Sequence, residues 1–125
     1  MVQTNYWFSR DEFASRVARV QAELKKDGFD AFLAFLPETV TYLTGFFTRG
    51  YSSFQFAIIP ASGDPVVICR DVEEYYLDSS CVFPGRVMWN DSDDKSWVAA
   101  SAITACLGNS PRLAVEMGAW TLSAA

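Results

Sequence analysis

The sequence contains no histidine among its 125 residues. A histidine-based zinc site, a Ser-His-Asp triad and a Cys-His dyad all need that side chain. None of them can be assembled from this chain alone, so catalysis within it would have to use carboxylates, lysine, cysteine or tyrosine. We therefore predict that the chain carries no catalytic residue and no metal-ligand set of its own.

Cysteine and basic residues are also scarce. The three cysteines, Cys69, Cys81 and Cys106, include no Cys-x-x-Cys pair, which is typical of reduced thiols in a cytoplasmic protein. Cys69 lies in an apolar strand pattern and Cys106 on an apolar helix stripe, so both are expected in the core. Ten basic residues face 15 acidic ones, a net charge of −5, which argues against nucleic acid as a partner.

Long apolar runs and closely spaced glycines are missing as well. The longest apolar runs, such as residues 31–36, are far shorter than the ~20 residues that cross a bilayer, and the first residues do not resemble a signal peptide. The seven glycines form neither a GxGxxG motif nor a P-loop. Asp91, Asp93 and Asp94 lack the glycine and closing glutamate of an EF-hand, so they predict a solvated loop leading into a helix.

What the chain does contain is enough apolar residues, 50% of the total, to form one core in a single domain over residues 1–125. The clearest element is an amphipathic helix. Ser9 and Glu12 form a capping box, the apolar stripe that follows has helical spacing, and Gly28 is typical of the residue that ends a helix.

The remaining pattern alternates strands and helices. Because residues 31–36 are apolar without alternation, we expect a strand covered on both faces. The order predicts an α/β domain with a mixed sheet flanked by helices. Strands are expected at 31–36, 54–59, 66–69, 86–90 and 112–116, and helices at 37–43, 72–79 and 94–107, with another starting at 117.

Three glutamates have structural and functional interpretations. Glu73 and Glu74 are adjacent, so on a helix their side chains would point about 100° apart. We expect both on the surface rather than in a paired acid/base site. Glu116 ends an apolar strand. Its carboxylate could be functional, but the favoured interpretation is that it accepts hydrogen bonds from the amino terminus of the next helix.

The segment between residues 46 and 54 is the most suggestive of a binding role. It carries several aromatic side chains around one charge, Arg49. A guanidinium can hold a carboxylate bidentately, and Phe47 and Tyr51 could form aromatic walls beside it. Two interpretations stay open: a loop that covers a substrate, or an ordinary connection in which Arg49 is solvated.

The order and spacing of several segments resemble the N-terminal domain of the creatinase/prolidase (Xaa-Pro peptidase) superfamily. The resemblance extends over essentially the whole chain. It rests on Phe13, Arg16, Val20 and Leu24, followed by residues 28–33, 42–46, 56–60, 63–68 and 115–120.

This resemblance implies an α/β domain of ribonuclease H-like topology that is the non-catalytic part of a cytoplasmic, metal-dependent C–N hydrolase. Two divalent metal ions would be held in a separate pita-bread catalytic domain that the chain lacks. The N-terminal domain would contribute to a homodimer and to the active-site mouth, with Phe47, Arg49 and Tyr51 as candidates for a lip over a small-molecule or dipeptide substrate. The alternative is an interaction module of a pita-bread protein that has lost its metals.

Overall fold

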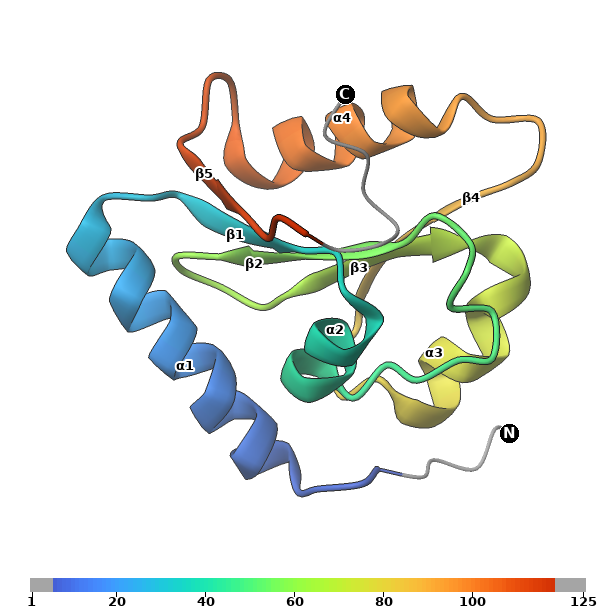
Figure 1. Cartoon of the computed structure of the whole chain (residues 1–125), viewed down its shortest axis with the longest axis horizontal. Helices are drawn as coiled ribbons and strands as arrows, with labels where there is room; N and C mark the ends of the chain where they lie inside the picture. Colours follow the sequence, from blue (N-terminus) through green and yellow to red (C-terminus); the bar gives the residue numbers. More distant parts are fainter. Residues whose placement is uncertain (1–5, 119–125) are drawn as a thin grey trace.

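A computed structural model describes residues 6–118, which form a mixed five-stranded sheet between two layers of helices (Figure 1). The α/β architecture predicted from the sequence is confirmed. In chain order the elements are α1 (Arg10–Asp27), β1 (Ala31–Ala34), α2 (Pro37–Thr44), β2 (Phe56–Pro60), β3 (Val66–Arg70), the 3-10 turn η1 (Asp71–Glu73), α3 (Glu74–Ser80), β4 (Gly85–Trp89), α4 (Lys95–Leu107) and β5 (Leu113–Val115).

The strands lie in the order β4-β3-β2-β1-β5. The central strands β1, β2 and β3 are antiparallel, with Leu33 opposite Ile58 and Ala57 opposite Val67. The outer strands β5 and β4 pair in parallel with β1 and β3. Helix α4 covers one face of this sheet, while α1, α2 and α3 cover the other (Figure 1).

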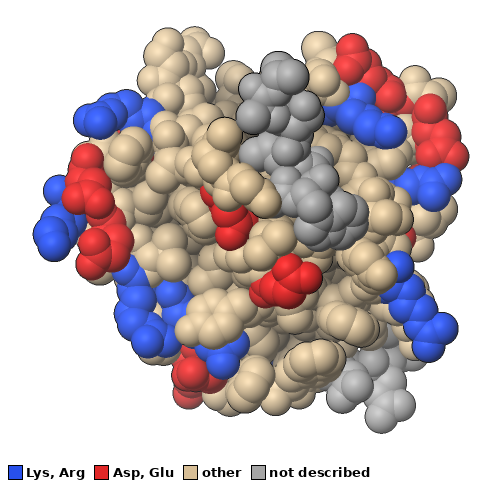
Figure 2. Space-filling view, viewed as in Figure 1, with Lys and Arg blue, Asp and Glu red and all other residues tan. Residues whose placement is uncertain are grey.

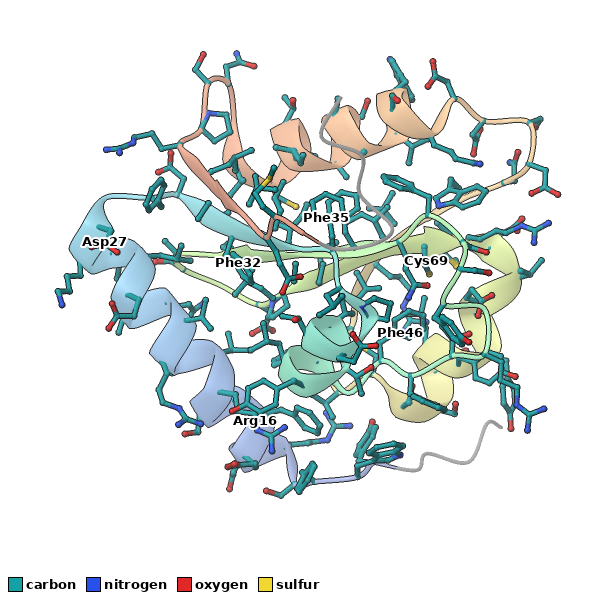
Figure 3. All side chains as sticks on the ribbon, viewed as in Figure 1. Arg16, Asp27, Phe32, Phe35, Phe46 and Cys69 are labelled. Carbon is teal, nitrogen blue, oxygen red and sulfur yellow. The ribbon has the colours of Figure 1, made fainter. Side chains whose placement is uncertain are left out.

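The sheet separates two apolar clusters, where the sequence predicted one. Residues of β1 point alternately to the two sides, because successive side chains in a strand face opposite ways. Leu33 and Phe35 join the cluster under α4, whereas Phe32 and Ala34 belong to the cluster under α1, α2 and α3. Figure 3 shows Phe35 on the α4 side and Phe32 on the α1 side. The prediction of a strand covered on both faces is therefore confirmed.

Helix α1 begins and ends where local signals predicted. The Ser9 hydroxyl accepts a hydrogen bond from the backbone N–H of Glu12, 3.1 Å away, which satisfies one of the free donors of the first turn. Gly28, with φ 75°, donates its N–H to the carbonyls of Leu24 and Lys25. Phe13 and Val17 lie on the buried side of this helix.

Helix α2 is capped by a residue far away in the sequence. Its N-cap is Leu36, which has no side-chain acceptor. Glu116 supplies one: its Oε1 accepts from the N–H groups of Phe35 and Leu36 at 2.9 and 2.6 Å, and its Oε2 accepts from the Thr39 hydroxyl at 2.6 Å. Glu116 thus binds a helix amino terminus as favoured, but that of α2 rather than of the next helix.

The other end of α2 requires glycine. Gly45 has φ 84°, a left-handed conformation that strains other residues, and a Cβ there would lie 2.5 Å from the Ser80 carbonyl oxygen. This contact fixes the point at which the segment after α2 starts along α3. The helix expected from residue 117 is not formed at Met117 or Gly118, and the rest of that prediction falls outside the described residues.

Candidate functional site

An aromatic hollow of about 500 Å³ opens where the start of α1, helix α2 and the segment after α2 meet. Large aromatic side chains surround it. Phe13 and Phe46 are buried, and five others are about half exposed or more: Trp7, Phe8, Tyr42, Phe47 and Tyr51. Exposed aromatics gathered at one place are unusual on a protein surface and point to a site that receives another molecule.

The side chains of segment 46–51 alternate between buried and exposed. Phe46 and Thr48 are buried, while Phe47, Arg49 and Tyr51 are exposed. Of the three lip candidates, Phe47 and Tyr51 line the hollow and Arg49 does not. No hydrogen bond or ion pair holds the Arg49 side chain within residues 6–118. A substrate role for these three residues remains a prediction.

Arg16 is the cation that lines the hollow. Only 9% of it is exposed. Its guanidinium lies 4.2 Å from the ring centroid of Tyr42 and 4.5 Å from that of Phe8, within cation–π distance. It also donates to the Tyr42 carbonyl at 3.0 Å and lies 3.4 Å from a Glu12 carboxylate oxygen. Figure 3 shows Arg16 near the amino-terminal end of α1.

Arg16 was not among the site residues predicted from the sequence. A signal was available: Arg16 follows Phe13 by three positions and precedes Val17, so it lies at the edge of the apolar stripe. An aromatic-rich neighbourhood can accept such a side chain, since its long aliphatic part packs like an apolar residue.

Glu73 corrects a prediction. It was expected on the surface with Glu74, but only 5% of it is exposed, whereas Glu74 is exposed. The cause is η1, a 3-10 turn that precedes α3 and turns the Glu73 side chain inward. There its Oε2 accepts a hydrogen bond from the Thr48 hydroxyl. A carboxylate from η1 therefore reaches the segment beside the hollow.

The cysteines offer no activated nucleophile in this structure. Cys69 is fully buried, and burial raises the pKa of its thiol to about 12. Burial also raises the pKa of Cys81, so both thiols stay protonated at neutral pH. Cys106, expected in the core, is exposed on α4. That helix is apolar around most of its surface, so periodicity alone could not identify its buried side.

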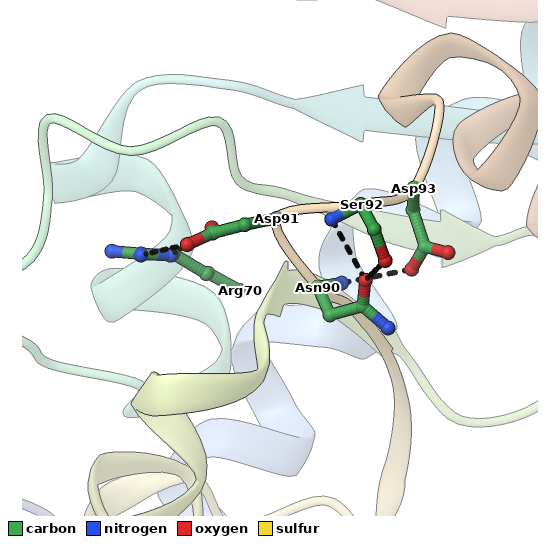
Figure 4. A network of polar contacts seen from close by, with 5 residues as sticks. All are labelled: Arg70, Asn90, Asp91, Ser92 and Asp93. Carbon is green, nitrogen blue, oxygen red and sulfur yellow. Dashed lines mark hydrogen bonds and ion pairs between the residues drawn. The ribbon is translucent and has the colours of Figure 1, made fainter.

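A smaller hollow of about 360 Å³ lies at the ends of β3 and β4, lined in part by Arg70, Asp91 and Lys95. Arg70 forms a bidentate pair with Asp91, at 2.8 and 2.7 Å (Figure 4). Asp93 accepts from the Asn90 N–H at 2.8 Å. Asp94 caps α4 by accepting from Ser96 and Trp97. The acidic cluster thus leads into a helix, as predicted.

On the face seen in Figure 2, charged side chains lie in small separate groups. Figure 2 shows basic side chains in separate groups toward the rim of this face, beside acidic ones, rather than in one continuous basic surface. Within residues 6–118 no group of three histidine, cysteine, aspartate or glutamate side chains could hold a metal ion. In that same part of the chain, no helix combines the length and apolar character that a bilayer crossing requires.

The family of this fold follows from comparison with known proteins. The Creatinase/Prolidase N-terminal domain family matches residues 16–125. The chain therefore belongs to this family, as the resemblance in its sequence implied.

Individual relatives agree with this assignment. The ectoine hydrolase of Halomonas elongata is 29% identical over 94 residues, which cover 75% of this chain and 22% of that protein. A prolidase from Thermococcus sibiricus has a TM-score of 0.73 and 26% identity, over 85% of this chain and 29% of its own. The dipeptidase PepE of Mycobacterium ulcerans shares the fold, with a TM-score of 0.74 and 22% identity, over 94% and 31% of the two chains. The chain thus spans between 22% and 31% of the length of these relatives.

Proposed function

We propose that this domain is the non-catalytic N-terminal part of a metal-dependent hydrolase that cleaves a C–N bond. One observation carries the proposal: the N-terminal family matches residues 16–125, while the chain spans only 22% of an ectoine hydrolase and 29% of a prolidase. The lack of histidine supports it. Hydrolysis with the help of two divalent metal ions would belong to a separate catalytic domain.

Within such an enzyme, the domain would contribute to a cytoplasmic homodimer and to the mouth of an active site. The exposed aromatic side chains around the hollow support this role. Trp7, Phe47 and Tyr51 are each 46% or more exposed, and the Trp7 and Phe47 rings lie 5.3 Å apart. Aromatic and arginine side chains are also the residues that contribute most at protein interfaces.

Arg49 remains our candidate for holding a substrate carboxylate, such as that of a dipeptide. Its exposure and its freedom from other partners among the described residues leave its five N–H donors available. Phe47 and Tyr51 precede and follow it at alternate positions, and both line the hollow. The substrate of this site would therefore combine a carboxylate with an apolar or ring-shaped group.

The experiment that tests the function compares the full-length gene product with the present chain. We expect the full-length protein to bind two divalent metal ions per subunit, to hydrolyse an Xaa-Pro dipeptide or a related C–N substrate, and to run as a dimer in light scattering. The present chain should neither hydrolyse such a substrate nor bind a divalent metal ion. A full-length protein without metal and without activity would instead favour an interaction module of a catalytically inactive relative.

Replacing Arg49 tests the lip directly. In the full-length enzyme, Arg49→Ala should lower kcat/KM by about 10-fold or more, equivalent to ~1.4 kcal/mol per decade. Arg49→Lys should rescue poorly, because an ammonium cannot make the bidentate contact. Arg19→Ala, an exposed arginine of α1 outside the aromatic hollow, is the matched control. Unchanged kinetics in both Arg49 variants would remove Arg49 from the site.

A further inference from the structure

The segment 46–51 is held on its inner side by two side chains from the neighbouring helical region. The N–H of Phe47 donates to the Ser80 hydroxyl at 3.0 Å. The Thr48 hydroxyl donates to the Glu73 carboxylate and accepts from the N–H of Gly50 at 2.9 Å. Figure 1 shows this segment running from α2 alongside α3 before it enters β2.

The Glu73 carboxylate is an unusual group to find in this position. It is 5% exposed, and its partner Thr48 is 4% exposed. Within residues 6–118 no arginine or lysine forms a salt bridge with it. Burial of a carboxylate without a cation is costly unless hydrogen bonds satisfy it. A buried carboxylate that contacts this segment without a salt-bridge partner is therefore not explained by packing alone.

Gly50 fits closely against the same carboxylate. A Cβ placed on Gly50 would overlap the Glu73 carboxyl group. The backbone of the segment thus rests directly on Glu73, and the Thr48 hydroxyl joins the two. The Thr48 side chain points inward, and the backbone at Gly50 lies against the Glu73 carboxyl group. The exposed side chains of the segment are therefore those of Phe47, Arg49 and Tyr51.

We infer that Glu73 is a positioning residue for segment 46–51: it holds Thr48 and Gly50 inward, so that Phe47, Arg49 and Tyr51 project outward as a fixed set. The inference rests on the proposed function for what these side chains bind. A pre-organised loop loses less conformational freedom when a ligand binds, and misplacement of about 1 Å is enough to weaken binding and catalysis.

The first test measures the segment itself and needs no substrate. Hydrogen exchange of the present chain should show the amides of Phe47 and Gly50 exchanging about 10-fold faster or more in Glu73→Ala and Thr48→Val. Amides in the middle of α4 should be unchanged. Thr48→Ser keeps the hydroxyl and should restore protection. Glu74→Ala, an exposed neighbour, is the matched control.

Unchanged exchange of the Phe47 amide in both Glu73→Ala and Thr48→Val would overturn the inference, whatever the enzyme does, because the acceptor of that amide, Ser80, is kept in both variants. Thermal unfolding of each variant shows whether it is folded. If Glu73→Ala does not fold, the Phe47 amide of Thr48→Val decides the result. Valine matches threonine in shape but cannot donate to Glu73, and the Ser80 acceptor of Phe47 is kept.

The second test asks whether this positioning serves the substrate. In the full-length enzyme, Thr48→Val should raise KM by about 5-fold or more with a smaller change in kcat, and Thr48→Ser should recover most of the loss. A faster-exchanging segment together with unchanged KM and kcat would leave Glu73 as a positioning residue and refute the lip function. The two proposals therefore fail in distinguishable ways.

Discussion

The two faces of the sheet are built on different principles. Under α4, the cluster that includes Leu33, Phe35 and Ile58 is apolar except for the indole N–H of Trp89, which donates to the Phe54 carbonyl at 3.0 Å. Under α1, α2 and α3, an apolar cluster is bordered by buried polar and charged side chains. In the described residues these belong to α1, α2, η1 and α3 or to the segment between α2 and β2: Arg16, Thr44, Thr48, Gln55, Glu73 and Ser80.

This difference separates stability from positioning. Apolar burial is non-directional, so it contributes stability without fixing one arrangement precisely. Buried hydrogen-bonding groups cost free energy unless each meets its partner, so they favour one arrangement over others. Both faces therefore stabilise the sheet through apolar burial, and the polar side chains of the second face in addition fix the segment after α2 and the aromatic hollow beside it.

The largest loss of stability, and so the strongest test of this comparison, is expected for a substitution on the α4 face. Leu33 is 5% exposed and lies in β1, an inner strand of the sheet, on the side that α4 covers. Leu33→Ala should lower the free energy of unfolding by ~2–5 kcal/mol through lost burial and a new cavity. Chemical denaturation monitored by circular dichroism measures this loss.

The matched control is Val72→Ala, which truncates a valine that is 59% exposed and should change stability by only about 0.5 kcal/mol or less. If Leu33→Ala unfolds at the same denaturant concentration as the wild type, the α4 face does not supply the stability assigned to it. The contrast between the two faces then fails.

The fold could largely be predicted because its signals are local. The capping residues of α1, the proline and glycine that bound α2, and the unbroken apolar pattern of β1 each depend on a few neighbouring residues. Phe47 and Tyr51 were selected from the sequence as aromatic side chains in a polar loop, and both line the hollow, while their role toward a substrate stays a prediction. The turn-forming residues 60–65 between β2 and β3 are typical of a hairpin connection, and the two strands are antiparallel.

What could not be predicted depends on long-range contacts. The burial of Glu73 depends on the η1 turn and on the contact with Thr48, which lies 25 positions earlier in the chain. Arg16 is buried because aromatic rings from α2 and the amino-terminal segment surround it. Cys106 is exposed because only one side of an evenly apolar helix faces the sheet. Neither composition nor periodicity carries this information.

The contact between Glu116 and α2 gives a smaller but sharper prediction. The Glu116 carboxylate ties the end of β5 to the amino terminus of α2 through three hydrogen bonds. Glu116→Gln keeps the shape but removes the charge and one acceptor oxygen. We expect a loss of about 1–2 kcal/mol in the free energy of unfolding, since N-terminal capping and charge-assisted hydrogen bonds have this magnitude.

Glu38→Gln is the matched control, because Glu38 lies in the first turn of the same helix but is exposed. Removal of its charge should affect only the interaction with the helix dipole and so lower the free energy of unfolding by about 0.5 kcal/mol. Equal effects of the two substitutions would mean that Glu116 acts through its charge alone. A larger effect of Glu116→Gln, together with faster exchange of the Phe35 and Leu36 amides, would establish the cap. The start of α2 would then depend, like the segment that follows its end, on a carboxylate supplied from elsewhere in the chain.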